Sequence, residues 1–433
     1  MRYTDFCSSF IFPFQEKMKG HDTVRWLKFL EQSQWWTAER LKHYADKKRD
    51  LLFEEVLKHV PYYQQKNRFD LVTKQDFRKQ FNDFKHLKAR SCQLQRTGGS
   101  TGEPLYFLIS NERISHDVAA KWRATRWFNV DIGDKEWVFW GSPIEISSQS
   151  IARKIRDFVF RSKLIPARNL DHQMLQDILL NLKRIKPRML FGYPSILALL
   201  ASYAERHRIK VNHLGIQVIF VTSEVLDPSQ RTLIQEIFGC IVANGYGGRE
   251  SGFIAHECPQ GSMHVTAEDI ILEIIQPDGK NCHEGEIGEV VVTHLHTRDF
   301  PFIRYRTGDY ASLRSSNCLC GRKLPILSHL EGRRSDLIFA QNGSLVHRAE
   351  IVAIITKERE IEQFQVIQES LYSMKISIKA ELLTISSQKR IIESLKLLLG
   401  QEVKVLIEKV DELERDASGK FRFVTSKIAQ GMF

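Results

Sequence analysis

The chain has 433 residues, of which 42% are hydrophobic and 27% charged, with seven cysteines and a formal net charge of +11. This composition is typical of a globular protein of two or three domains, and no apolar run is long enough to predict a transmembrane helix. The low, odd cysteine count argues against a disulfide framework and favours a reducing, cytoplasmic compartment. Because Asp5 and Pro13 interrupt the apolar N-terminus, we interpret it as part of the mature protein rather than a signal peptide.

The positive charge is concentrated in two regions. Residues 1–90 carry 19 Lys and Arg against 12 Asp and Glu, and residues 151–190 carry 10 against 3. Basic patches suit nucleic acid, anionic lipid or phosphorylated small molecules, but a solvated basic surface is the simplest interpretation. No zinc-finger or aromatic RNA-binding motif accompanies them, so we expect no nucleic-acid partner.

The order of predicted elements indicates an α/β protein. Apolar spacing in the first 90 residues, as in 38–60, predicts helices. Strands and helices then alternate, which predicts parallel sheet. The predicted strands are 136–141, 188–193, 216–223 and 240–246, and the helices are 173–185, 194–207 and 228–239.

After about Met263 the pattern changes. Strands at 269–276, 288–295 and 309–314 are separated by Gly and Asp turns, which suggests antiparallel pairing. The last hundred residues indicate a small α+β domain beyond a polar, Gly-containing break. We therefore predict a large domain over residues 1–333, with a mostly helical lead-in to residue 90, and a small C-terminal domain over 334–433 that carries Lys420.

Four short motifs contain candidate functional residues. The loop at 97–104 holds three glycines and two hydroxyl residues, which suits a backbone cradle for phosphate but equally a simple turn. The segment 244–252 follows a buried strand and offers Tyr246 as a flat face and Glu250 as a metal-binding carboxylate. Asp309 ends a predicted strand in a Thr-Gly-Asp turn, and Lys420 lies near the C-terminus.

In this order and spacing the motifs resemble those of the adenylate-forming superfamily. The loop resembles its Ser/Thr-rich phosphate loop, and the other three its Tyr-Gly-x-x-Glu, Thr-Gly-Asp and Gly-Lys motifs. Within the superfamily the chain is most similar to the phenylacetate–coenzyme A ligase family, including relatives linked to capsule polysaccharide biosynthesis. Further matches extend from about residue 55 to 425, at 60–65, 71–81, 191–197, 256–258, 301–309, 318–325 and 331–338.

The resemblance implies an AMP-forming acid–thiol ligase. ATP would activate a carboxylic acid to an acyl-adenylate, releasing pyrophosphate, and a thiol, most often coenzyme A, would then displace AMP. Lys420 would bridge the carboxylate and the α-phosphate, Glu250 would hold Mg²⁺, and the small domain would rotate near Arg334–Asp336 between the steps. The nucleotide-binding residues implied are Thr97, Gly98, Gly99, Ser100, Thr101, Gly102, Tyr246, Gly247, Asp309, Arg333 and Glu224.

One position departs from the family pattern. Relatives usually carry Lys before the loop proline, and here that position is Glu103. Either another basic residue such as Arg96 substitutes for it or ATP handling is weakened. A catalytically decayed nucleotide-binding homologue is therefore one alternative. The other is an adenylating enzyme that loads an acyl carrier protein, or an amine or sugar acceptor, in polysaccharide or secondary-metabolite synthesis.

Four residues suggest a separate structural metal site. Cys258, His264, Cys318 and Cys320 supply a Cys₃His set that suits tetrahedral zinc with no position left for water. His256 and the Cys282–His283 pair are rival ligands, and ordinary reduced thiols are the other interpretation.

The substrate and the oligomeric state are less well defined. By family analogy the acid would bind near Trp140, Tyr193 and Ser223, between segments 139–145 and 221–225, although each aromatic side chain suits the core equally well. A homodimer is one possible assembly, and nothing in the sequence identifies the acid.

Overall fold

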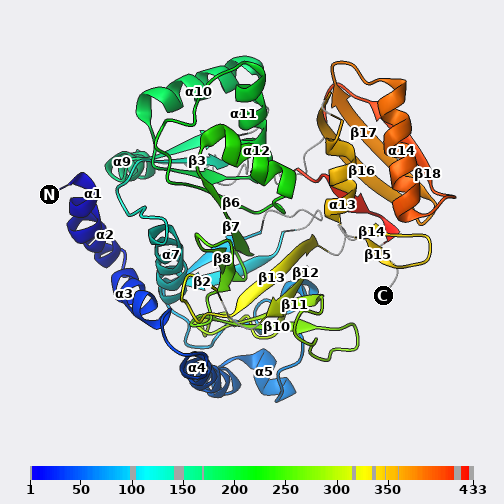
Figure 1. The fold of residues 1–433 in the computed structure, drawn as a ribbon. Coiled ribbons are helices and arrows are strands. Elements are labelled where there is room, and N and C mark those ends of the chain that lie inside the picture. The colour runs from blue at the N-terminus through cyan, green and yellow to red at the C-terminus, as the bar shows by residue number, and fades with distance from the viewer. Residues whose placement is uncertain are drawn as a thin grey trace.

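The computed structural model describes residues 2–97, 104–140, 151–167, 170–314, 318–333, 338–346, 348–358, 360–413 and 421–428. Helices dominate the first 80 residues and follow the outer edge of the molecule (Figure 1). They are α1 (Tyr3–Phe6), the π-helix η1 (Cys7–Ile11), α2 (Phe12–Met18), α3 (Thr23–Ser33), α4 (Ala38–His59), α5 (Pro61–Lys66) and α6 (Lys74–Lys79). Thr73 begins α6 with a reciprocal capping box to Asp76, which satisfies two backbone donors at the helix start.

An eleven-stranded sheet lies at the centre of the large unit, in the order β10-β11-β12-β13-β9-β8-β7-β6-β5-β3-β4. The strands are β3 (Glu136–Trp140), β4 (Ser162–Pro166), β5 (Met189–Gly192), β6 (Val218–Thr222), β7 (Ile241–Gly248), β8 (Gly252–Glu257), β9 (Met263–Val265), β10 (Ile270–Ile275), β11 (Gly288–His294), β12 (Tyr305–Arg314) and β13 (Ile326–Arg333). Strands β4, β3, β5, β6 and β7 pair in parallel, and the pairings from β7 to β10 are antiparallel. The predicted α/β fold class, and the change from parallel to antiparallel pairing, are confirmed.

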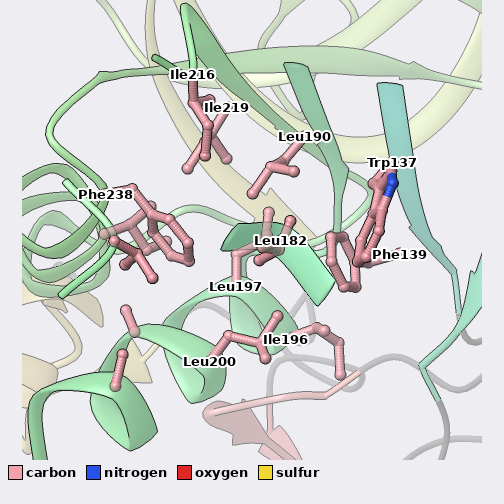
Figure 2. Packing of buried hydrophobic residues seen from close by; sticks show 14 of the residues in the cluster. Trp137, Phe139, Leu182, Leu190, Ile196, Leu197, Leu200, Ile216, Ile219 and Phe238 are labelled. Carbon is pink, nitrogen blue, oxygen red and sulfur yellow. The ribbon is translucent and has the colours of Figure 1, made fainter. Parts of the chain in front are cut away.

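The parallel half is covered by helices. These helices are α9 (Ile151–Val159), α10 (His172–Ile185), α11 (Pro194–Arg206) and α12 (Pro228–Phe238), whereas α7 (Asn111–Arg126) packs against α3 and β8. Figure 2 shows Ile196, Leu197 and Leu200 of α11 packed towards Phe139 and Leu190 of the sheet. Strands covered on both faces need continuous apolar runs, which explains why residues 218–221 are all buried. The helices and strands predicted between residues 136 and 246 are therefore confirmed.

Outside this sheet, β1 (Cys92–Arg96) and β2 (Tyr106–Ser110) form an antiparallel hairpin. The C-terminal elements form a separate layer with its own apolar core, seen at the right of Figure 1. They are β14 (Ile338–Phe339), β15 (Leu345–Val346), α13 (Arg348–Thr356), β16 (Ile361–Ser370), β17 (Ser373–Ala380), α14 (Ile385–Leu399), β18 (Lys404–Lys409) and β19 (Val424–Ser426). Strands β18, β17, β16 and β19 form one sheet in that order.

Polar and apolar contacts join the C-terminal layer to the large unit, and Tyr310 of β12 packs against Phe339 of β14. Arg206 of α11 forms an ion pair with Glu362 of β16 at 2.9 Å, and the backbone N–H of Phe421 donates to Glu224 Oε1 at 2.7 Å. Among the described residues, no helix is both long and apolar enough to cross a bilayer.

Candidate active site

A cavity lies where the carboxyl ends of β6 and β7 meet the C-terminal layer. Strand β7 pairs in parallel with β6 and antiparallel with β8, and ligands of α/β proteins bind at such changes of strand order. The lining residues of the large unit are Ser223, Glu224, Val225, Asn244, Gly245, Tyr246, Gly247, Asp309, Leu330, Gly332 and Arg333. Those of the C-terminal layer are Arg348, Phe421 and Arg422. The cavity therefore has walls from both parts of the chain.

The floor of this cavity holds a carboxylate fixed from two sides. The Tyr246 hydroxyl donates to Asp309 Oδ2 at 2.9 Å, and Arg333 Nε lies 3.5 Å from Asp309 Oδ1. Burial, followed by the nearby charge of Asp309, raises the pKa of Tyr246 well above its ordinary value. The hydroxyl therefore keeps its proton and donates it in the hydrogen bond to Asp309. This arrangement presents a fixed anionic acceptor beside an aromatic ring.

The position of Asp309 corrects one expectation. Asp309 does not end a strand, because β12 continues to Arg314 and Asp309 pairs with Arg333 of β13. Against β11, Arg306 and Tyr310 face Val291 and Glu289, so the stretch between them bulges. Gly308 has φ +78°, a conformation that glycine adopts without the strain of a side chain. The Thr-Gly-Asp motif is therefore a bulge within a strand, which aims Asp309 into the cavity.

Glu250 lies next to this floor, beyond the end of β7. Its Oε1 accepts a hydrogen bond from the Tyr305 hydroxyl at 3.2 Å and lies 3.5 Å from Lys74 Nζ. Burial raises the pKa of Glu250, but the charge of Lys74, a backbone N–H and the charge of Arg333 outweigh it, and the pKa lies below the ordinary value. Glu250 is therefore a partly buried carboxylate, 12% exposed and with a lowered pKa, that is suited to holding a cation.

The backbone around Glu250 is supported from behind by a buried guanidinium. Arg113 of α7 donates from Nη1 to the carbonyl oxygen of Glu250 at 2.8 Å and from Nη2 to that of Arg249 at 2.9 Å. Arg113 is 1% exposed, and its Nε lies 3.4 Å from Asp117 Oδ2. His294 Nε2 lies 3.6 Å from the other oxygen of Asp117. Arg113 thus fixes two consecutive peptide groups of the Tyr-Gly-x-x-Glu motif.

The hairpin places both ends of the glycine-rich loop near Glu250. Thr97 and Leu105 close the loop through a backbone bond of 2.9 Å and a second bond to the Thr97 hydroxyl of 3.0 Å. Arg249 Nη1 donates to the Arg96 carbonyl at 3.0 Å. Burial lowers the pKa of Arg249; the charge of Glu250 raises it and the charge of Arg96 lowers it, and the net shift is downward.

Glu224 joins the two parts of the chain at the cavity. Its Oε2 accepts the backbone N–H of Ser195 at 3.1 Å, and its Oε1 accepts that of Phe421. Ser223, just before it, has φ +72°, a left-handed conformation that costs a non-glycine residue roughly 1–3 kcal/mol. Such strain is typical of functional turns. Phe421 directly follows Lys420 in the sequence.

Several predicted residues fall outside the described part of the chain. They are Gly98, Gly99, Ser100, Thr101, Gly102, Glu103, Lys420, the segment 141–145 and the predicted hinge at 334–336. Gly247 lies in the cavity wall, where an added Cβ would come within 2.3 Å of the Gly252 carbonyl oxygen, so the position requires glycine.

The residues predicted for the acid pocket separate into two groups. Ser223 lines the cavity, whereas Tyr193 belongs to the apolar core and Trp140 packs against that core. The rings of Trp140 and Tyr193 lie 4.7 Å apart. Neither ring is among the described residues that line the cavity. The buried indole N–H of Trp140 has no hydrogen-bond partner among the described residues.

The four predicted zinc ligands come together. The ligand atoms of Cys258, His264, Cys318 and Cys320 all lie within 4.8 Å of one another. The sulfurs of Cys258 and Cys318 are 3.6 Å apart, and Cys320 Sγ is 3.2 Å from His264 Nε2. A tetrahedral zinc ion separates such atoms by roughly 3.5–3.8 Å, so the set fits the ion.

The surroundings of this cysteine–histidine cluster agree with a closed metal site. His264 Nδ1 lies 3.2 Å from the Leu324 carbonyl oxygen, which leaves Nε2 directed at the sulfurs. The rival ligands lie elsewhere: His256 stacks on Phe253 with ring centroids 5.1 Å apart, and Cys282 lies in the apolar cluster around β10 and β11.

Sequence reasoning missed Arg113, Asp117 and Lys74. Arg113 and Asp117 are four residues apart, which places them on one helix face, but the sequence does not reveal that this face is buried. Lys74 lies in a segment recognised only by resemblance, and its signal is the capping box that begins α6.

Known proteins share both the sequence and the architecture. The AMP-binding enzyme family matches residues 36–297, and the CapK C-terminal domain family matches residues 338–427. Protein CapK of Staphylococcus aureus is 25% identical over 373 residues, which are 84% of this chain and 80% of that protein. Phenylacetate–coenzyme A ligase of Pseudomonas putida is 24% identical over 187 residues, 42% of each chain.

A solved structure shows the same fold over nearly the whole chain. A 2-hydroxyisobutyryl-CoA ligase in its postadenylation state aligns over 92% of both chains, with a TM-score of 0.74 and 19% identity. The same ligase in its thioesterification state, with an adenylate and CoA, gives a TM-score of 0.59 over 93% of both chains at 18% identity. The family match over residues 36–297 covers more than half of the chain, so the chain belongs to the AMP-binding, adenylate-forming enzyme family, and it is similar to CapK over most of its length.

Proposed function

We propose that this protein activates a carboxylic acid with ATP and then transfers the acyl group to the thiol of coenzyme A. In the first step a carboxylate oxygen attacks the α-phosphorus, and the bond to pyrophosphate breaks. In the second step the thiolate attacks the acyl carbon, and AMP leaves. The observation that carries the proposal is the cavity with Asp309, Tyr246 and Arg333 on its floor and Phe421, next to Lys420, at its other wall.

The nucleoside half of ATP is assigned to the cavity floor. Asp309 would accept hydrogen bonds from the two ribose hydroxyls, since both its oxygens keep further lone pairs. Tyr246 would pack against adenine while its hydroxyl holds Asp309 in place. Arg333, whose Nε lies 3.5 Å from Asp309 Oδ1, would offer a cation to the α-phosphate.

The phosphate half is assigned to the region around Glu250. Glu250 would hold Mg²⁺, which when bound neutralises charge on the phosphates as pyrophosphate departs. The backbone N–H groups of residues 98–102 would cradle the β- and γ-phosphates. Arg249, which donates to the Arg96 carbonyl, and Arg96 would supply cations beside this loop, in which the sequence has Glu103 in place of the usual lysine.

The thiol step is assigned to a second arrangement of the C-terminal layer. The higher TM-score to a ligase in its postadenylation state supports the view that this structure has the arrangement of the first step. Lys420 would have to leave the cavity before a thiol enters, so domain rotation separates the half-reactions.

Pyrophosphate exchange tests the proposal. The full chain would be incubated with ATP, Mg²⁺, labelled pyrophosphate and a panel of aryl, fatty and amino acids, with Lys420→Ala as the inactive reference. Acid-dependent exchange in the wild type and its loss in Lys420→Ala are expected. AMP release that requires coenzyme A identifies the thiol. If AMP were released only with a carrier protein or an amine, that molecule would be the acceptor instead of coenzyme A. If no acid supported exchange, adenylation itself would be contradicted.

We also propose that the cysteine–histidine cluster binds one structural zinc ion. The ligand separations and the orientation of His264 support it. The ion would connect the loop after β8 to the loop between β12 and β13, the strand pair that carries Asp309 and Arg333. All seven cysteines are free of disulfides, which supports a reducing, cytoplasmic location.

A further inference from the structure

Large apolar side chains lie exposed along the N-terminal helical segment, residues 3–18. Tyr3, Phe6, Phe10, Phe14 and Met18 recur every three or four positions, and each is 44–75% exposed. We call these five residues, four aromatic residues and Met18, the aromatic row. The rings of Phe6 and Phe10 are 5.7 Å apart, so the row is continuous there. An apolar stripe of this kind on a surface helix marks a contact surface.

The opposite face of the same segment is firmly held, so the row is not exposed by fraying. Cys7 and Phe12 are buried, and the Phe12 ring packs edge-on against Phe160 at 6.1 Å. The Thr4 hydroxyl donates to Asp134 Oδ1 at 2.8 Å. These contacts fix the rotation of the helix and direct the aromatic row outward.

Positive charge lies next to the aromatic row. Lys17 and Lys19 belong to the segment itself and are exposed. Residues 151–163 carry five Lys and Arg against one Asp, and this stretch touches the segment where the Tyr3 hydroxyl donates to the Val159 carbonyl at 2.7 Å. Figure 1 shows α1, α2 and α9 at the same outer edge of the molecule.

Helix α9 repeats the pattern of the aromatic row. Ile151, Ile155 and Phe158 are 79%, 60% and 83% exposed, at a spacing of four and three residues. Arg153, Lys154 and Arg156 lie between them in the sequence. Two neighbouring helices therefore combine exposed apolar side chains with cations.

We propose that the aromatic row, together with α9 and its basic residues, is a docking surface for an anionic lipid bilayer. A helix with aromatic side chains on one face and lysines beside it lies in the membrane interface, with the apolar face among the acyl chains and the cations at the lipid phosphates. A second copy of the chain fits less well, since a twofold contact would bring the same lysines and arginines together. The cavity is not involved, so docking is independent of the proposed enzymatic function.

Vesicle co-sedimentation tests the proposal. The full chain is mixed with vesicles of phosphatidylcholine alone or with phosphatidylglycerol added. We expect binding to the anionic vesicles that weakens with salt, and little binding to the neutral ones. The double variant Phe10→Ser/Phe14→Ser should lower the partition coefficient by about tenfold or more, and Lys17→Glu/Lys154→Glu by about fivefold.

The control variants change exposed leucines and lysines of the C-terminal layer, away from the proposed docking surface. Leu382→Ser/Leu397→Ser removes two leucines that are 68% and 79% exposed, and Lys389→Glu/Lys404→Glu reverses two exposed lysines. Both should bind vesicles as the wild type does. Circular dichroism confirms that each variant is folded.

Three results would overturn the proposal. The first is no binding of the wild type to anionic vesicles, and the second is equal binding by the aromatic-row variant and its control. The third is a wild-type dimer in sedimentation velocity that Phe10→Ser/Phe14→Ser converts to a monomer without vesicle binding, because the row would then be a contact between copies.

Discussion

The nucleotide cavity and the cysteine–histidine cluster both draw on the antiparallel half of the sheet, but they are built differently. The cluster takes its four ligand atoms from one unit, within 4.8 Å of one another. The cavity takes Asp309 and Tyr246 from the sheet and needs Phe421 from the C-terminal layer to complete its wall. The cavity proposed to admit ATP and release AMP is assembled from two parts, whereas the cluster proposed to hold a structural ion is closed within one.

The largest effect is expected at the cavity floor. Asp309→Asn keeps the shape of the side chain but removes the charge that would receive two ribose hydroxyls, so kcat/KM for ATP should fall about 100- to 1000-fold. Pyrophosphate exchange measures the loss. Zinc content should stay unchanged if the two sites are separate, and a change in activity below threefold would remove Asp309 from the nucleotide site.

Arg113→Lys should have the next largest effect. A lysine has no planar fork for the carbonyls of Arg249 and Glu250, so the loop that carries Glu250 loses its support and kcat/KM should fall about 10- to 100-fold. We expect kcat to fall and the Mg²⁺ concentration needed for half-maximal rate to rise.

The control for this change is on the same helix. Arg126→Lys alters a partly buried arginine paired with Glu31 and Asp131, away from the loop, and should leave the kinetics unchanged. If both variants lost only thermal stability, Arg113 would be a structural residue without a positioning role.

Cys318→Ser should affect zinc binding and stability while leaving the adenylation activity of the cavity nearly unchanged. With one ligand lost, bound zinc should fall from one equivalent towards zero and the melting temperature by about 3–8 °C, since metal binding contributes to folding. Adenylation well below that temperature should change less than twofold. Elemental analysis and thermal denaturation provide the readouts, with Cys282→Ser, outside the cluster, as control. Wild-type protein without zinc would refute the site.

The smallest change is a shift in pH dependence. Lys74 is among the groups that hold the pKa of Glu250 below its ordinary value against the effect of burial, so Lys74→Met should raise that pKa. Glu250 would then take up a proton at higher pH, and the acid limb of kcat/KM should move to higher pH. Lys79→Met, on the exposed face of α6, is the control. An unmoved acid limb would show that Glu250 does not limit activity there.

The Lys74→Met substitution should also alter how the free energy of unfolding depends on pH. The depressed pKa of Glu250 contributes stability above the unfolded pKa, and this contribution is lost as pH falls through the folded value. The wild type should therefore lose more stability on acidification than Lys74→Met does.

Residues carried by local motifs were predictable from the sequence. Tyr246, Glu250, Asp309 and the four proposed zinc ligands were all named from spacing and resemblance. The structure places Tyr246 and Asp309 in the cavity wall and Glu250 beside Lys74, and it brings the four proposed zinc ligands together. The strands were predictable because buried parallel strands leave continuous apolar runs, as in residues 218–221.

Residues that act through tertiary contact were not predictable. Arg113 and His294 are 181 positions apart and meet only through Asp117, because β11 lies against α7. The bulge at Gly308 was read as the end of a strand, since a Gly-Asp pair gives the same local signal in both cases. Packing, rather than residue type, decides between such alternatives.

The bond from Phe421 to Glu224 sets a scale for how firmly the two parts of the chain hold together. A hydrogen bond to an ionised group contributes about 1.5–3 kcal/mol, which biases a two-state equilibrium by roughly 10- to 150-fold. For the proposed rotation, this bias would favour the arrangement seen here and leave about one molecule in ten to one in 150 in the other state when nothing else differs. A cycle that alternates between two arrangements needs such a reversible preference, because a tighter latch would slow every turnover.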